Sequence, residues 1–222
     1  MWTRVELKDK AKNILRKSYW KAFGVSLILT ILGAGASGNF SNSRITNSEN
    51  AEILFNPAFV IMILGFVLFA FLIRIFIGYN VEVGGAKYFI KSSKEDFNFG
   101  YLLDTFKSGH YINVVITMFL RALYTFLWSL LLIIPGIIKS YAYSLVPYIL
   151  SENPDMEPSE AISLSSSMTE GHKLDIFILD LSFIGWYILG GLLFGIGVLF
   201  VNPYVNATKA ELYLKLKEIY QG

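Results

Sequence analysis

The 222 residues of this chain are 54% hydrophobic and 16% charged, and the mean hydropathy of +0.51 indicates an integral membrane protein. No polar stretch is long enough for a separate soluble domain, so residues 1–222 are expected to form one membrane domain. The absence of cysteine excludes disulfides, thiolate metal sites and a cysteine nucleophile, and a net charge of +2 without a basic tract argues against nucleic-acid partners.

Residues 1–21 predict a cytoplasmic amphipathic helix. They carry seven Lys and Arg residues, and Thr3 with Glu6 fits a capping box at the helix start. One face of this helix collects the apolar side chains of Val5, Leu7, Ala11, Ile14 and Leu15. The pattern is typical of an interfacial helix on an anionic leaflet, so anionic inner-leaflet lipids are expected partners.

Two apolar runs follow, separated by a polar loop. Residues 22–36 form the first expected span, and residues 38–56, rich in Ser, Asn and Gly, form an outer loop. Residues 57–79 form the second span, because they hold a single charge and about 20 apolar residues cross the ~30 Å hydrocarbon layer. Gly84 and Gly85 are expected to break the chain before short helices on the inner surface.

Residues 111–134 and 137–150 are the third and fourth expected spans. Pro135 and Gly136 lie between them and predict a sharp re-entry turn. A polar helix is expected over Glu157–Glu170, with Gly171 as its C-cap.

Residues 176–204 are too long for one untilted span, so one span and a hairpin both remain open. The hairpin gives a fifth span at 176–193 and a sixth at 198–214. With six spans, 15 of the 19 Lys and Arg residues lie in inner segments, as the positive-inside rule requires. We therefore predict an all-α, polytopic protein of the cell membrane with about six short transmembrane helices, interfacial helices and both termini cytoplasmic.

Several short strings resemble a bacterial family of integral membrane proteins, the domain of unknown function 975. They are Glu6-Leu7-Lys8, Ile134-Pro135-Gly136, Gly171-His172-Lys173, Ser182-Phe183-Ile184-Gly185-Trp186 and Asn202-Pro203-Tyr204. A weaker likeness extends to the membrane domain of glycerophosphodiester phosphodiesterases, whose catalytic domain this chain lacks. The resemblance implies a multi-span helical fold in a membrane, and it brings no catalytic residues.

Three charges inside expected spans form a candidate polar network: Arg74, Arg121 and Asp180. A charge in the hydrocarbon layer costs several kcal/mol unless it is paired or reaches the interface. We expect Asp180 to pair with Arg74 first and with Arg121 second. The network is either a polar path or ligand site, or an ion pair that fixes helix packing.

Asn202, Pro203 and Asn206 form a candidate helix break in the sixth span. Broken helices line transporter sites, but a proline also produces an ordinary kink. No catalytic constellation accompanies these residues: His110 and His172 have no metal-ligand spacing, and the serine cluster containing Ser165 lacks a nucleophile elbow. Ser165 is interpreted as a small packing residue.

The sequence therefore predicts a non-enzymatic membrane protein without a cofactor. The first functional hypothesis is that the protein is an accessory or membrane-homeostasis protein. It would then act on the lipid bilayer, on a protein partner or on a second copy of itself. The alternative is a small transporter or channel-like protein that uses the in-span Arg and Asp residues. The two differ in whether the in-span charges line a cavity or pair in a dry core.

Overall fold

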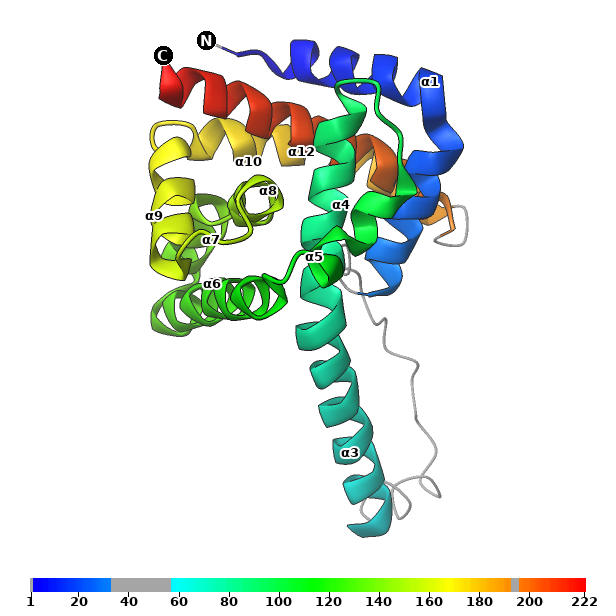
Figure 1. The fold of residues 1–222 in the computed structure, drawn as a ribbon. Helices are drawn as coiled ribbons and strands as arrows, with labels where there is room; N and C mark the ends of the chain where they lie inside the picture. The colour runs from blue at the N-terminus through cyan, green and yellow to red at the C-terminus, as the bar shows by residue number, and fades with distance from the viewer. Residues whose placement is uncertain (1, 33–56, 193–195) are drawn as a thin grey trace.

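Every regular element in the described part of the chain is a helix, which confirms the predicted all-α fold (Figure 1). The computed structural model describes residues 2–32, 57–192 and 196–222. The longer helices are α1 (Arg4–Ile31), α3 (Pro57–Ile73), α4 (Tyr79–Ser92), α6 (Tyr111–Leu131), α7 (Ile133–Ala142), α8 (Val146–Glu152), α9 (Pro158–Met168), α10 (Lys173–Leu181), α11 (Ile184–Leu192) and α12 (Gly197–Gln221). Short elements join them: the π-helix η1 (Arg74–Gly78), the 3-10 helix η2 (Phe99–Leu103) and α5 (Asp104–Lys107).

Four helical segments within the described residues are long and apolar enough to cross a membrane, by length and composition. They are Pro57–Ser92, Tyr111–Leu131, Ile133–Glu152 and Lys173–Leu192. Each contains or overlaps one predicted span, and together they indicate a membrane protein. The total of six spans stays a prediction, because part of 22–36 and the whole loop 38–56 lie outside the described residues.

Helix α1 packs along α12 at the end of the molecule that carries both termini (Figure 1). The Thr3 side chain caps α1 by accepting from the Glu6 N–H at 3.3 Å. Of the predicted apolar face, Leu7, Ala11 and Leu15 are buried in the protein core, whereas Val5 is 69% exposed. Most of this face therefore packs on the protein rather than on the membrane surface. Contact of its basic residues with anionic lipids stays a prediction.

Helix α12 continues through Pro203, and the predicted helix break is therefore wrong. The two neighbouring asparagines have another role. Asn202 donates to the Thr30 hydroxyl at 2.9 Å, and Asn206 donates to the Ser26 hydroxyl at 3.0 Å. Because such bonds between side chains hold helices together in an apolar environment, these asparagines fasten α12 to the second half of α1.

One continuous helical segment, Pro57–Ser92, combines α3, η1 and α4. Its α4 end runs through the bundle, whereas α3 extends away from it and has no buried residue (Figure 1). The predicted break at Gly84 and Gly85 is wrong. A Cβ at Gly84 would lie 2.5 Å from the Leu102 carbonyl oxygen, and one at Gly85 would lie 2.8 Å from the Leu29 side chain. These glycines therefore permit close packing of η2 and α1 against α4.

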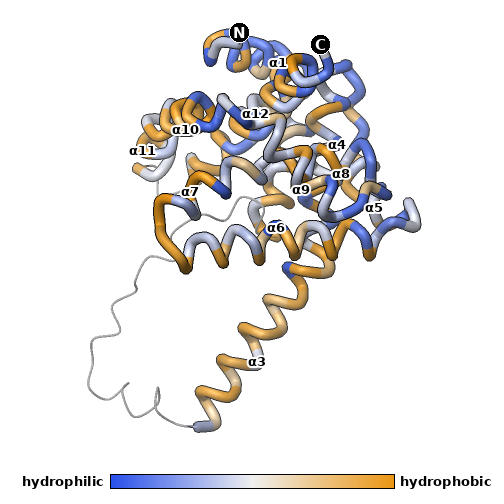
Figure 2. Tube along the Cα trace, turned by 90° about the vertical axis from the view of Figure 1, so that its left-hand side faces the viewer, coloured by the Kyte–Doolittle hydropathy of each residue, from blue (hydrophilic) through white to orange (hydrophobic). Residues whose placement is uncertain are grey.

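Helices α6 and α7 form a tight hairpin whose turn lies at Leu132, with φ −158° and ψ 142°. The predicted turn at Pro135 and Gly136 is therefore displaced. Pro135 lies in the first turn of α7, where its missing N–H removes no helical hydrogen bond. The hairpin tip presents five exposed apolar residues, 130–134, and forms a hydrophobic corner in Figure 2.

Gly136 allows α7 to approach α6, because a Cβ there would lie 2.6 Å from the Ser129 Cα. We expect Gly136→Ala to lower the free energy of unfolding by about 1–3 kcal/mol, since backbone atoms must move to make room. The matched control is Gly65→Ala in α3, which meets no atom within 4 Å. Denaturant titration of the purified protein measures both, and equal stability of the two variants would contradict the close approach.

Residues 176–204 form more than one helix. α10 and α11 are separated at Ser182 and Phe183, and α11 packs on α12. A Cβ at Gly190 would lie 2.8 Å from the Gly197 carbonyl carbon, and one at Gly197 would lie 2.6 Å from the Gly190 Cα. The close approach of α11 and α12 at Gly190 and Gly197 favours the hairpin over a single span. Residues 193–195, which join the two helices, lie outside the described part of the chain.

Candidate functional site

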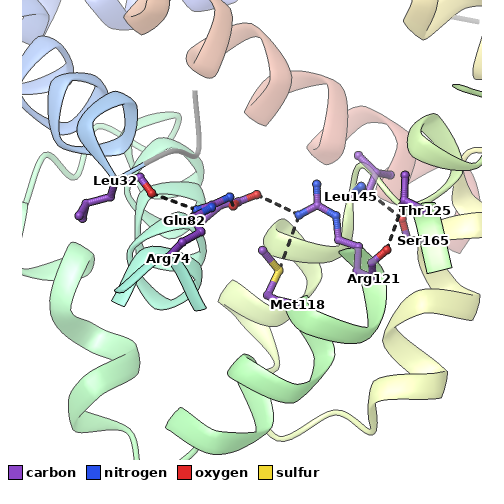
Figure 3. Close-up of polar contacts among 8 residues, drawn as sticks. All are labelled: Leu32, Arg74, Glu82, Met118, Arg121, Thr125, Leu145 and Ser165. Carbon is purple, nitrogen blue, oxygen red and sulfur yellow. Dashed lines mark hydrogen bonds and ion pairs between the residues drawn. The ribbon is translucent and has the colours of Figure 1, made fainter. Parts of the chain in front are cut away.

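A carboxylate between two guanidinium groups lies inside the bundle. Arg74 donates to one Glu82 oxygen at 2.8 Å, and Arg121 donates to the other at 2.9 Å (Figure 3). The Glu82 side chain is only 14% exposed. We call Arg74, Glu82 and Arg121 the charged triad. It carries a formal charge of +1, because two guanidinium groups share one carboxylate.

The π-helix η1 sets the geometry between Arg74 and Glu82. The Tyr79 N–H bonds to the Arg74 carbonyl across five residues, and a π-turn holds more residues than an α-turn. Residues eight apart can therefore share one face of the helix. Arg74 also donates to the Leu32 carbonyl at the end of α1, at 3.4 Å.

Arg121 enters the triad from α6, a different helix. One of its terminal nitrogens, Nη1, bonds to Glu82 and lies 3.7 Å from the Met118 sulfur. The Arg121 carbonyl accepts a bond from Thr125 at 2.8 Å. The triad thus links α6 to the long helix that contains Arg74 and Glu82.

The predicted pairing of Asp180 with Arg74 or Arg121 is wrong. Asp180 of α10 faces Lys209 of α12 at 3.4 Å, and both arginines bind Glu82. The sequence prediction does not include Glu82, because the predicted second span ends at Tyr79 and leaves this carboxylate outside the membrane. The eight-residue spacing between Arg74 and Glu82 on one uninterrupted helix is the signal that could have identified it.

Glu82 and Arg121 of the triad nevertheless share one cavity, of about 180 Å³, with the Asp180–Lys209 pair. Its polar and ionisable lining residues are Glu82, Arg121, Tyr141, Ser144, Tyr148, Asp180, Asn206 and Lys209. A second cavity of about 380 Å³ also touches Glu82 and Arg121 and is lined by Arg74 as well. The triad therefore adjoins two cavities, and Arg121 and Asp180 of the predicted network line the same one.

Ser165 provides a hydrogen-bond partner for two backbone groups at the break between α7 and α8. Its hydroxyl donates to the Ala142 carbonyl at 2.7 Å and accepts from the Leu145 N–H at 3.2 Å, and the side chain is fully buried (Figure 3). A break in a helix leaves backbone groups without intrahelical partners. The predicted packing residue is thus also the partner of two orphaned groups.

Three of the strings that resemble the family meet where α1 approaches α12 and the link between α10 and α11. Lys8 donates to the Ser182 carbonyl at 3.2 Å and lies 4.1 Å from the centre of the Phe183 ring. Phe183 in turn contacts the Tyr204 ring at 5.3 Å. Burial lowers the pKa of Lys8, and the charges of Lys12 and Arg4 lower this pKa further. These contacts hold the first half of α1 against α12 and the link between α10 and α11. None of the residues in this cluster lines the central cavity.

Neither histidine belongs to the charged triad. His172 Nδ1 lies 3.9 Å from Asp175, and the His172 ring lies 6.3 Å from Trp2. Within residues 2–32, 57–192 and 196–222, no three or more His, Cys, Asp or Glu residues group together in a way that could hold a metal ion.

The four apolar helices indicate a helical membrane protein, and a cavity lined by polar and charged side chains lies in its bundle. The chain belongs to the family described as protein of unknown function (DUF975), whose model matches residues 1–139 and 130–219. This result confirms the family resemblance. Searches of the curated proteins and of the solved structures each found no match, and the weaker likeness to glycerophosphodiester phosphodiesterases stays a prediction.

Proposed function

We propose that this protein is a non-enzymatic, multi-pass protein of the cell membrane that admits a small polar solute to its central cavity, as a small transporter or channel-like protein does. The observation that carries the proposal is the placement of Glu82, Arg121, Asp180 and Lys209 around one cavity. Charges that only fixed helix packing would be expected to lie in a dry core.

The size and lining of the cavity support this proposal. A volume of about 180 Å³ has room for roughly six water molecules at ~30 Å³ each. Polar groups converge on it from α4, α6, α10 and α12, and charged residues within membrane helices commonly mark solute or ion pathways.

Both chain ends lie at the same end of the described structure, opposite the free end of α3 (Figure 1). This arrangement supports the proposal that both termini are cytoplasmic. Exposed basic residues of α1 lie at that end, among them Arg4, Lys10, Lys12, Arg16 and Lys17, so anionic inner-leaflet lipids remain proposed partners.

An accessory protein is the second candidate, and the exposure of α3 favours it. This helix has 17 residues without a charge, and none is buried within the chain. Lipid covers such a helix in a monomer, whereas a partner helix or a second copy covers it in a complex.

Water access to the cavity separates the two candidates. The chain has no cysteine, so Ser144→Cys places a single thiol on the cavity wall. In native membranes a small hydrophilic thiol reagent should label this variant, because a solute path must admit water. Labelling is measured by mass spectrometry.

Thr117→Cys is the matched control, since Thr117 is fully buried in α6 and does not line the cavity. It should stay unlabelled under conditions that label Ser144→Cys. If both thiols stay unlabelled in folded protein but react after denaturation, the cavity is closed to water and the accessory candidate is favoured.

A further inference from the structure

One edge of the Arg121 guanidinium has no partner among the described residues. Nη1 serves Glu82 and Met118, whereas no described group bonds to Nε or to the second terminal nitrogen. Figure 3 shows that nitrogen directed away from Glu82, on the side of Leu145, which also lines the central cavity. A parallel pair of N–H groups is therefore available on the cavity side of Arg121.

The charge around this edge is unbalanced. Asp180 and Lys209 compensate each other, and Glu82 compensates one of the two arginines that bind it. One positive charge remains, and an uncompensated charge in a low-dielectric interior is costly. A bound monovalent anion would remove this cost.

We propose that the central cavity binds a small oxyanion, a carboxylate or a phosphate, through the free Nε–Nη2 edge of Arg121. The planar fork of a guanidinium matches two oxygens of such a group. Lys209 lies on the same cavity with its charge paired to Asp180, and Tyr141 and Tyr148 line the cavity with further hydroxyl groups. The cavity volume of about 180 Å³ limits the ligand to a few heavy atoms beyond the anionic group. This inference rests on the proposed function and names its solute class.

The test compares anions on the purified protein in nanodiscs of zwitterionic lipid. Sodium acetate and sodium phosphate should each raise the unfolding temperature in a saturable manner at constant ionic strength, relative to sodium chloride. Arg121→Gln should weaken the apparent affinity about tenfold or more, because it removes a charge-assisted bidentate contact. Arg121→Lys should weaken it as well, since an ammonium keeps the charge without the fork.

Lys139→Gln is the matched control. Lys139 is another cation in a candidate span, lying 5.1 Å from the Trp128 ring, and it does not line the cavity. This variant should respond to acetate as the unchanged protein does. An acetate effect of equal size in Arg121→Gln, or the same response to chloride, would overturn the proposal.

Nanodiscs that contain an anionic lipid distinguish a lipid headgroup from a free anion. If the headgroup occupies the site, anionic lipid should stabilise the protein and abolish the acetate effect, and both changes should depend on Arg121. Stabilisation by anionic lipid that persists in Arg121→Gln, without any acetate effect, would contradict the site. Labelling of Ser144→Cys without an anion effect would overturn the anion site and leave the proposed function intact. An anion effect without labelling would support the anion site and contradict the solute path of the proposed function.

Discussion

Glu82→Gln is expected to cost about 3–5 kcal/mol of unfolding free energy, because it leaves two guanidinium groups uncompensated in the bundle. Glu82 accepts from both Arg74 and Arg121, and glutamine keeps its size while removing its charge. Unfolding of the purified protein by a denaturing detergent measures the change.

Asp180→Asn is the matched control for this prediction. Its partner Lys209 has a side chain that is 40% exposed and lies at 3.4 Å, so water replaces much of the lost interaction and the cost should stay near or below 1 kcal/mol. Combining Glu82→Gln with Arg121→Gln should cost less than the sum of the two single changes. Equal costs for Glu82→Gln and Asp180→Asn would show that the triad is not the central electrostatic contact.

Ser165→Ala is expected to destabilise the protein by about 1–3 kcal/mol, the cost of one buried unsatisfied group. The change leaves the Leu145 N–H without its acceptor, whereas the Ala142 carbonyl loses the Ser165 hydroxyl but keeps the Thr169 hydroxyl at 3.4 Å. The same unfolding measurement reports this loss.

Ser163→Ala is the matched control, since Ser163 lies on the same helix with an exposed side chain. It should change the stability by less than about 0.5 kcal/mol. Amide exchange adds a local readout: Ser165→Ala should speed exchange at Leu145, whereas Ser163→Ala should not. Unchanged exchange at Leu145 in Ser165→Ala would contradict the bridging role of the hydroxyl.

The charged triad could be predicted only in part. Its two arginines are evident because each is an isolated charge in an apolar run. Their shared carboxylate is not, because Glu82 follows a stretch that is less apolar than 57–79 and precedes two glycines. Gly84 and Gly85 lie within the helix at places where Leu102 and Leu29 approach closely, and a local sequence window does not contain those neighbours.

The sequence by itself determined the helical class, the apolar segments over 57–79, 111–134, 137–150 and 176–193, and local features such as the Thr3 cap. These follow from hydrophobicity and short-range hydrogen bonding, which act between residues close in the chain. Only the tertiary structure decided which charges meet, where the α6–α7 turn falls, and that α12 runs unbroken through Pro203. The charge pairing depends on side chains that are distant in sequence, because buried polar groups take whichever partner the packed helices bring within reach.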